Sequence, residues 1–404
     1  MPRHTALTPS RIQVLAAVYL PALLLAVSEG MLVPTLPLFA SSLHVSFGVV
    51  GLVLAAESLG TLVADVPAGA LLDRFGDKPL MVFGLALVIV AVLLLVFTRS
   101  VLTVIALRLA AGVGLALFNL SRHAYLTRAT AGGRRGRAIS TFGGVGRAGS
   151  FLGPAVGGLI ASAFGLRAPF AVYSAVSLAA LVVVVAAVPR AEPGAVAARA
   201  VRPRTATLGL AGFAALRRFA GVLSTAGVAQ LMAQMLRAGR KVLLPLYASQ
   251  VLGLPVGSVG FILSASAFAD LSLFYPAGLL MDRRGRKFAI VPSFLVQAAG
   301  LALVPATQGF ATLLGVGLLL GFGNGLSAGS MMTLGADLAP PEALGEFLGV
   351  WRLVGDAGSS GGPLLVGAVA DVLDLGLAAV AVAAVGIAAA AVFAYRVPET
   401  LREA

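Results

Sequence analysis

The sequence contains no cysteine and only three histidines. The absence of cysteine excludes disulfides, thiolate metal sites and cysteine nucleophiles. His4, His44 and His123 lie far apart in the sequence, and none has the spacing of a metal-binding motif. The chain also lacks the phosphate-binding loop G-x-x-x-x-G-K-[ST], which argues against ATP hydrolysis. We therefore expect no metal and no cofactor.

Charged residues are scarce, at 11% of the 404 residues, while 59% are hydrophobic and the mean hydropathy is +1.00. Soluble proteins carry about 25% charged and about 45–50% apolar residues. Twelve membrane spans would need roughly 240 apolar-rich positions, which is close to the number that this composition supplies. The composition excludes a soluble enzyme and predicts an all-α polytopic membrane protein.

The net charge of +13 is compatible with nucleic-acid binding in isolation. Membrane proteins, however, concentrate Lys and Arg in their cytoplasmic loops. We therefore expect membrane lipid, and no nucleic acid, as a partner.

Charge clusters, Gly/Pro turns and hydropathy minima divide the chain into twelve candidate helices. They cover approximately residues 12–39, 47–72, 79–97, 101–121, 138–164, 168–188, 220–249, 257–281, 288–306, 310–334, 346–370 and 375–396. The longest polar stretch separates six of them from the other six. This pattern predicts an N-terminal six-helix bundle at 1–188, a cytoplasmic linker at 189–219 and a C-terminal six-helix bundle at 220–404.

Basic residues are distributed unequally between alternate loops. If the N-terminus is cytoplasmic, the cytoplasmic segments carry 21 Lys and Arg, while the outside loops carry only Arg99 and Arg167. Because basic loops are retained in the cytoplasm, both termini are predicted to be cytoplasmic.

The two halves repeat one another at an offset of 209 residues. The segment from Pro67 to Lys78 recurs from Pro276 to Lys287, the pair Gly112 and Gly114 recurs as Gly321 and Gly323, and Gly149, Gly153 and Pro154 recur as Gly358, Gly362 and Pro363. Six helices separate the copies, so both halves have the same orientation in the membrane. Parallel repeats of this kind place a binding site between the halves near the midplane.

These motifs resemble those of the major facilitator superfamily of secondary transporters. The loop signature G-x-L-x-D-R-x-G-R-K is similar to residues 69–78 and is matched in full by residues 278–287. The signature residues are Gly69, Asp73, Arg74, Gly76 and Lys78, and in the second copy Gly278, Asp282, Arg283, Gly285, Arg286 and Lys287. The resemblance implies that Asp73 caps a helix of the other half when the inner gate is shut. The alternative is that these residues mark only a cytoplasmic turn.

A second motif lies in the segment 138–164 and resembles G-x-x-x-G-P-x-x-G-G, which is associated with drug:proton antiporters. Its residues are Gly149, Gly153, Pro154, Gly157 and Gly158. Glycines at every fourth position share one helix face and permit close backbone approach, and proline removes a backbone donor. We expect this face to form a close, bendable contact between the two halves, or else ordinary helix packing.

Charged residues inside spans are costly and mark candidate functional sites. Burial favours the neutral form of a carboxylate, and a neighbouring arginine favours the ionised form. Glu29 with Arg108 is the leading pair for proton coupling, because the equivalent arginine in related antiporters is thought to serve the first helix. A static ion pair is the alternative. Further candidates for the cavity are Glu57, Asp270, Asp356, Asn119 and Asn324.

Arg237, Arg240 and Lys241 share one face of the segment 220–249. They could supply a counter-charge across the cavity or bind an anionic substrate. The alternative is that Arg240 and Lys241 extend outward or pair with Asp270.

The sequence therefore predicts a proton-coupled exporter of small amphipathic compounds, monomeric, in the inner membrane of a prokaryote. An exporter or uptake system for an organic anion or a sugar-like solute is the alternative on the same fold. An intramembrane enzyme is disfavoured, because the buried carboxylates sit singly on different helices.

Overall fold

The computed structural model describes residues 18–129, 135–188 and 217–401, and every regular element within these ranges is a helix. The first half contains α2 (Leu20–Ser41), α3 (Phe47–Phe75), α4 (Asp77–Leu95), α5 (Val101–Ala129), α6 (Arg135–Phe164) and α7 (Ala168–Ala187). The second half contains α10 (Ala220–Val222), α11 (Val228–Leu246), α12 (Val256–Ser272), α13 (Phe274–Arg284), α14 (Arg286–Leu303), α15 (Phe310–Leu326), α16 (Ser330–Leu338), α17 (Leu344–Val372) and α18 (Leu375–Tyr395).

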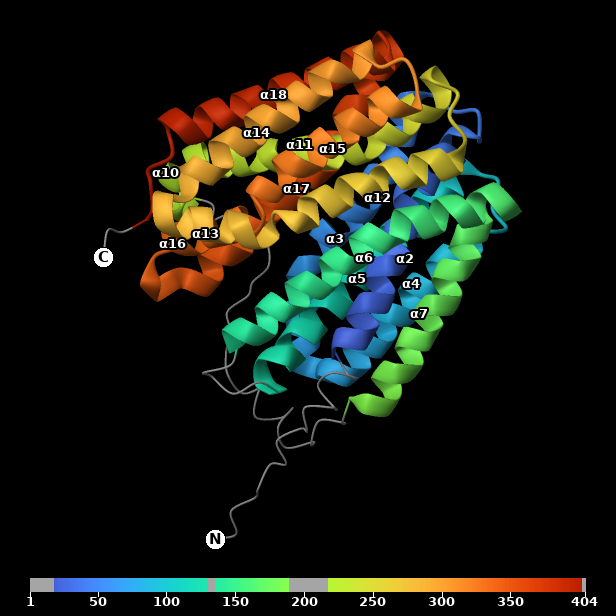
Figure 1. Ribbon diagram of the computed structural model, residues 1–404. Helices are drawn as coiled ribbons and strands as arrows, with labels where there is room; N and C mark the ends of the chain where they lie inside the picture. The colour runs from blue at the N-terminus through green and yellow to red at the C-terminus, as the bar shows by residue number, and fades with distance from the viewer. Residues whose placement is uncertain (1–17, 130–134, 189–216, 402–404) are drawn as a thin grey trace.

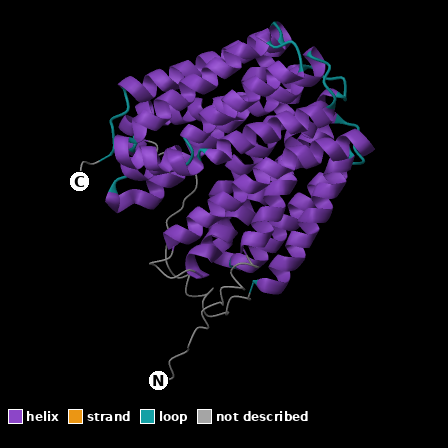
Figure 2. Cartoon of the chain, in the orientation of Figure 1, coloured by secondary structure: helices purple, strands orange, loops and turns teal. Residues whose placement is uncertain are grey.

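The helices form two bundles, α2–α7 and α10–α18, which touch near one end and diverge toward the other (Figure 1). The short loops 42–46, 165–167, 252–255 and 373–374 lie at the end where the bundles touch, which we call the distal side (Figure 2). We call the opposite end, where α2 begins and α18 ends, the terminal side. The predicted linker lies almost entirely outside the described residues, so the domain limits stay a prediction.

Nine helical segments in the described part of the chain are long and apolar enough to cross a membrane. The other three long helices, α6, α11 and α17, contain more glycine or charged residues. They pack at the contact between the bundles: α6 packs on α2 and on α12, while α17 packs on α11 and on α3. These three helices are less apolar because one face meets another helix or the space between the halves.

Two of the predicted spans are interrupted. The span predicted at 257–281 is divided between α12 and α13, because Pro276 has no N–H to donate to the Ser272 carbonyl and α12 ends at Ser272. The span predicted at 310–334 is divided between α15 and α16 near Gly329, which has φ 78°. The span predicted at 220–249 contains two π-helical turns, at Leu223–Gly227 and Tyr247–Val251, on either side of α11.

The repeat found in the sequence has a counterpart in the hydrogen bonding. Lys78 donates from Nζ to the Val185 carbonyl at 2.7 Å, and Lys287 donates to the Ala394 carbonyl at the same distance. Lys287 follows Lys78 by 209 residues, and Ala394 follows Val185 by the same number, so the two bonds are repeat equivalents. The turns agree as well, since Gly76 and Gly285 both have positive φ (80° and 108°) between consecutive helices. These positions need glycine because other residues rarely adopt such backbone angles.

The halves meet on the distal side through a pair of matching backbone contacts. A Cβ atom added to Gly51 would overlap the Pro363 carbonyl, and one added to Gly260 would overlap the Pro154 carbonyl. Gly260 is the repeat equivalent of Gly51, and Pro363 is the repeat equivalent of Pro154. The two contacts are therefore related by the pseudo-twofold axis of the repeats. At the loops, Asp371 of α17 accepts hydrogen bonds from the amides of Phe47 (2.6 Å) and Gly48 (2.9 Å) at the start of α3. The structure is therefore closed on the distal side.

Candidate functional site

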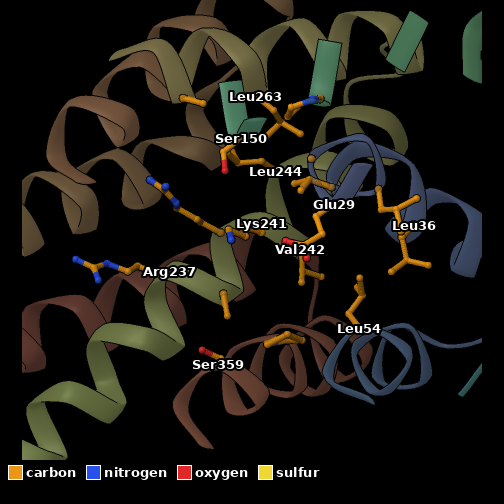
Figure 3. Close-up of a pocket in the computed structure, with 18 of the residues that line it drawn as sticks. Glu29, Leu36, Leu54, Ser150, Arg237, Lys241, Val242, Leu244, Leu263 and Ser359 are labelled. Carbon is orange, nitrogen blue, oxygen red and sulfur yellow. The ribbon is translucent and has the colours of Figure 1, made fainter. Parts of the chain in front are cut away.

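A cavity of about 500 Å³ lies between the two halves. Helices α2, α3, α5, α6 and α7 line it from the first half, and α11, α12, α15 and α17 line it from the second (Figure 3). Of the candidate site residues, it is lined by Glu29, Glu57, Arg108, Arg237, Arg240, Asp270 and Asn324. Most of the charged residues that line the cavity could therefore be identified from the sequence. Which of them form ion pairs with one another is seen only in the structure.

The expected pairing of Glu29 with Arg108 is wrong in this structure. Arg108 Nη1 of α5 lies 2.6 Å from Glu57 Oε2 of α3. The Arg108 side chain is buried, and that of Glu57 is 29% exposed. Because α3 and α5 are adjacent along their length, this ion pair lies within one half and neutralises both charges.

Asp270 does not pair with the cations of α11. Its carboxylate instead accepts a hydrogen bond from Arg147 of α6 at 2.9 Å, which links the two halves. Arg147 also lies over the ring of Phe274, 4.8 Å from its centroid.

Asp356 belongs to a second link between the halves, nearer the terminal side. Arg352 of α17 lies 3.3 Å from Asp65 of α3 and 3.6 Å from Asp356 one turn along its own helix. This arrangement suits a gate between α3 and α17 rather than contact with a solute in the cavity.

Glu29 and Lys241 line the cavity from opposite halves and point into the same space (Figure 3). Neither forms an ion pair or hydrogen bond with any residue in the described part of the chain. Arg237 donates to Ser327 Oγ at 2.7 Å, and Arg240 donates to the Leu320 carbonyl at 2.9 Å. Arg237 and Arg240 are therefore held by neutral groups, and none of the three α11 cations has a carboxylate partner in the described part of the chain.

The two asparagine candidates differ in position. Asn324 lines the cavity. The side chain of Asn119 accepts a hydrogen bond from Arg122 at 2.7 Å. Groups of three or more His, Cys, Asp or Glu that could hold a metal ion do not occur among the described residues.

The loop signature behaves differently in the two halves. In the second half, Arg286 bonds both Asp282 (2.8 Å) and Asp337 (3.1 Å). In the first half, Asp73 forms no ion pair or hydrogen bond within the described ranges, and it does not reach a helix of the other half. The capping role implied by the resemblance stays a prediction for another conformation.

Glu399, which the sequence analysis missed, fastens the segment after α18 to the start of α14. Its carboxylate accepts hydrogen bonds from the amides of Arg286 (2.9 Å) and Lys287 (3.0 Å). Partial burial by itself raises the pKa of Glu399, but bonds from four backbone amides, including these two, lower it below the ordinary value of 4.5. Because the ionised carboxylate accepts these bonds more strongly than the protonated group, the contact is strongest at neutral pH and weakens as pH falls through that lowered pKa.

The glycine motif of α6 packs mainly within one half, which agrees with the alternative of ordinary helix packing. A Cβ atom added to Gly149, Gly153 or Gly157 would collide with Ala26, Gly30 or Met31 of α2. Gly158 and Pro154 are the motif residues that face α12, at Gly260. Residues 149, 153 and 157 therefore hold α6 against α2, and the neighbouring face of α6 contacts the other half.

Ser264 of α12 bridges two backbone groups of α6 beside Pro154. Its Oγ accepts a hydrogen bond from the Ala155 amide at 2.8 Å and donates to the Phe151 carbonyl at 2.7 Å. In a regular helix these two groups bond to each other, four residues apart. A hydroxyl from one half thus takes part in the backbone hydrogen bonding of the other.

We expect Ser264→Ala to weaken distal closure without unfolding the protein, because the amide of Ala155 and the carbonyl of Phe151 can bond to each other. Loss of about 1 kcal/mol would shift the balance of conformations about fivefold. Arg99→Cys and Gln308→Cys would place spin labels on distal loops of the two halves, and the natural chain has no cysteine to interfere. Ser272→Ala is the matched control, since its hydroxyl bonds only within α12. Unchanged label distances in Ser264→Ala would contradict the expectation.

Ser264 and Asp371 gave no motif signal. The structure has an equivalent contact in the other repeat, where Ser162 lies against Gly257, the equivalent of Gly48.

The sequence model of the Major Facilitator Superfamily matches the chain twice, over residues 18–236 and 226–404. The chain belongs to the major facilitator superfamily. Members of this superfamily are transporters, so the protein is a multi-pass membrane transporter of small molecules and not an enzyme. The two overlapping matches correspond to the two bundles.

Several relatives resemble this transporter along much of its length. The uncharacterized MFS-type transporter MJ1560 of Methanocaldococcus jannaschii is 23% identical over 346 residues, 86% of this chain and 88% of that protein. Multidrug resistance protein MdtH of Aeromonas hydrophila is 27% identical over 320 residues, 78% of this chain and 77% of that protein. Multidrug resistance protein 2 of Bacillus subtilis is 31% identical over 153 residues, 38% of each chain. Archaeal and bacterial relatives imply the inner membrane of a prokaryote.

The crystal structure of the nucleoside transporter NupG superposes with a TM-score of 0.73, covering 95% of this chain and 98% of that one. The sequences are 16% identical, so this likeness supports the fold alone.

Proposed function

We propose that this transporter exports small amphipathic compounds in exchange for protons, by alternating exposure of the cavity to the two sides of the membrane. The observation that carries the proposal is Glu29, a carboxylate on the wall of a cavity built by both halves that has no ion-pair partner among the described residues. The names of two relatives, both multidrug resistance proteins, support export. The Gly-Pro motif of α6 supports antiport by resemblance.

Glu29 is suited to exchange a proton because no fixed partner holds it in one charge state. Lys241 of α11 faces Glu29 of α2 from the other half, and a nearby cation stabilises the ionised form of a carboxylate. Movement of α11 relative to α2 would change the distance to Lys241, and with it the proton affinity.

The distribution of basic residues supports a cytoplasmic terminal side with both termini inside. In this orientation the structure is closed toward the outside. Six-helix bundles at 1–188 and 220–404, joined by a cytoplasmic linker at 189–219, would rock about the cavity as a monomer surrounded by lipid. The links Arg147–Asp270 and Arg352–Asp65 would break or reform as the halves move.

Proteoliposomes with an internal pH dye test the proposal. We expect a transported compound to drive proton movement in wild type, and Glu29→Gln to abolish this movement. Arg99→Gln, which removes a charge from an exposed loop, is the control for altered net charge. If the compound crosses without proton movement, coupling to protons is wrong, and if Glu29→Gln behaves as wild type, the role of Glu29 is wrong.

The alternative function is transport of an organic anion or a sugar-like solute. The three cations of α11 favour the organic anion, because none has a carboxylate partner within the described part of the chain. Competition among cationic, neutral and anionic compounds would separate the two functions.

A further inference from the structure

The charges that line the cavity do not cancel. Glu57 is neutralised by Arg108 and Asp270 by Arg147. The lining charges that have no ion-pair partner among the described residues are Glu29, Lys241, Arg237 and Arg240. Glu29 and Lys241 face the space where a solute would bind, and Arg240 lines it as well (Figure 3). The guanidinium of Arg237 instead turns into the second bundle, where it bonds Ser327 and lies 5.5 Å from the ring centroid of Phe294.

The cations retain unused hydrogen-bonding capacity. Lys241 has three donors and no hydrogen-bond or ion-pair partner within the described ranges. Its side chain is exposed toward the cavity, so these donors are accessible to a bound group. A ligand with an anionic group would satisfy them, and the positive charge of α11 favours such a ligand over a neutral one.

Glu29 favours a positively charged group on the same ligand, because its carboxylate is anionic. It faces Lys241 across the cavity without forming an ion pair (Figure 3). A group of a ligand can therefore lie between them, with an ammonium on the Glu29 side and an anionic group on the α11 side.

The apolar lining lies on the distal side of these charges. Leu36 follows Glu29 by seven residues along α2, a rise of about 10 Å, and Leu244 follows Lys241 along α11. Leu54 and Leu263 precede Glu57 and Asp270 on helices that begin at the distal side. The cavity thus has a charged part toward its middle and an apolar part at its closed end.

We propose that the substrate is an amphipathic zwitterion. Its anionic group binds Lys241 together with Arg240, its ammonium binds Glu29, and its apolar body extends toward Leu36 and Leu54. This inference rests on the proposed function, because it assigns the substrate class of the same cavity.

Proton coupling separates a zwitterion from a simple anion. An anion near Glu29 favours the protonated carboxyl group, so that anion and proton bind together. An ammonium competes with the proton for Glu29, so that binding of the substrate releases the proton. Among ligands that use the α11 cations, the zwitterion is the class that is compatible with exchange for a proton.

Three probes that share one apolar body test the proposal. They are 4-phenylphenylalanine, its methyl ester, and 3-(4-biphenylyl)propanoate, which are a zwitterion, a cation and an anion respectively. Binding to the detergent-solubilised protein is measured by titration calorimetry at about pH 6, where the amino group of the ester is protonated and the carboxylates of the other two probes are ionised. We expect the zwitterion to bind about 10- to 100-fold more tightly than either of the others, as expected for an added charge-assisted hydrogen bond. Equal or tighter binding of the ester or of the anion would overturn the proposal, the latter in favour of an organic-anion transporter.

Two substitutions assign the groups. Lys241→Gln should remove the preference for the zwitterion over the ester, while Lys241→Arg, which keeps the charge, should retain it. Glu29→Gln should remove the preference over the anion, and Arg99→Gln should change neither. An unchanged preference in both Lys241→Gln and Glu29→Gln would contradict the assignment. Because binding is measured without a membrane, loss of proton exchange in proteoliposomes would contradict the proposed function and leave this result standing.

Discussion

Replacing Gly260 with valine is expected to move the transporter away from the distally closed conformation. A Cβ atom on Gly260 would overlap the carbonyl of Pro154, and Gly158 lies beside it at 3.0 Å. The neighbouring atoms are backbone, so they cannot rotate away as a side chain could. Overpacking of this kind costs about 1–3 kcal/mol, which corresponds to a shift of about 5- to 150-fold between two conformations.

The measurement is the distance between spin labels on Arg99→Cys and Gln308→Cys, together with the transport rate. We expect a longer distance and slower transport in Gly260→Val. Gly51→Val should have the same effect, because its contact with Pro363 is the repeat equivalent. Gly315→Val is the matched control, since no atom lies within 4 Å of a Cβ atom at that position. If Gly260→Val keeps the wild-type distance, this contact does not limit closure.

Arg108→Gln is expected to destabilise the first half strongly. The substitution leaves Glu57 without its partner, 2.6 Å away, between α3 and α5. Removing one member of a fully buried ion pair costs about 3–5 kcal/mol, and the loss here is smaller because the Glu57 side chain is 29% exposed. Thermal unfolding of the detergent-solubilised protein, compared with Arg99→Gln, measures the loss.

A second substitution identifies the partner of Arg108. Adding Glu57→Gln to Arg108→Gln should recover most of the stability, because it removes the unpaired charge. Adding Glu29→Gln should recover none of it. If Glu29→Gln recovers the stability instead, Arg108 pairs with Glu29, as the sequence predicted.

Several features of this protein follow from the sequence because their causes are short-range or additive. The apolar composition required a membrane, since no soluble core could bury it. The offset of 209 residues predicted parallel halves, and the paired bonds of Lys78 and Lys287 agree with it. The turn glycines Gly76 and Gly285 could be identified because positive φ depends on the residue itself.

The tertiary structure decided which charges meet and where the halves touch. Sequence spacing gives the depth of Glu29, Glu57 and Arg108 in the membrane, but not the rotation of each helix about its axis. That rotation directs Arg108 to Glu57 and leaves Glu29 facing Lys241. The hydrogen bonds of Ser264 with α6, and those of Glu399 with the start of α14, likewise depend on the tertiary structure. Each joins residues more than 100 positions apart, and such pairs depend on how complete helices pack rather than on any local pattern.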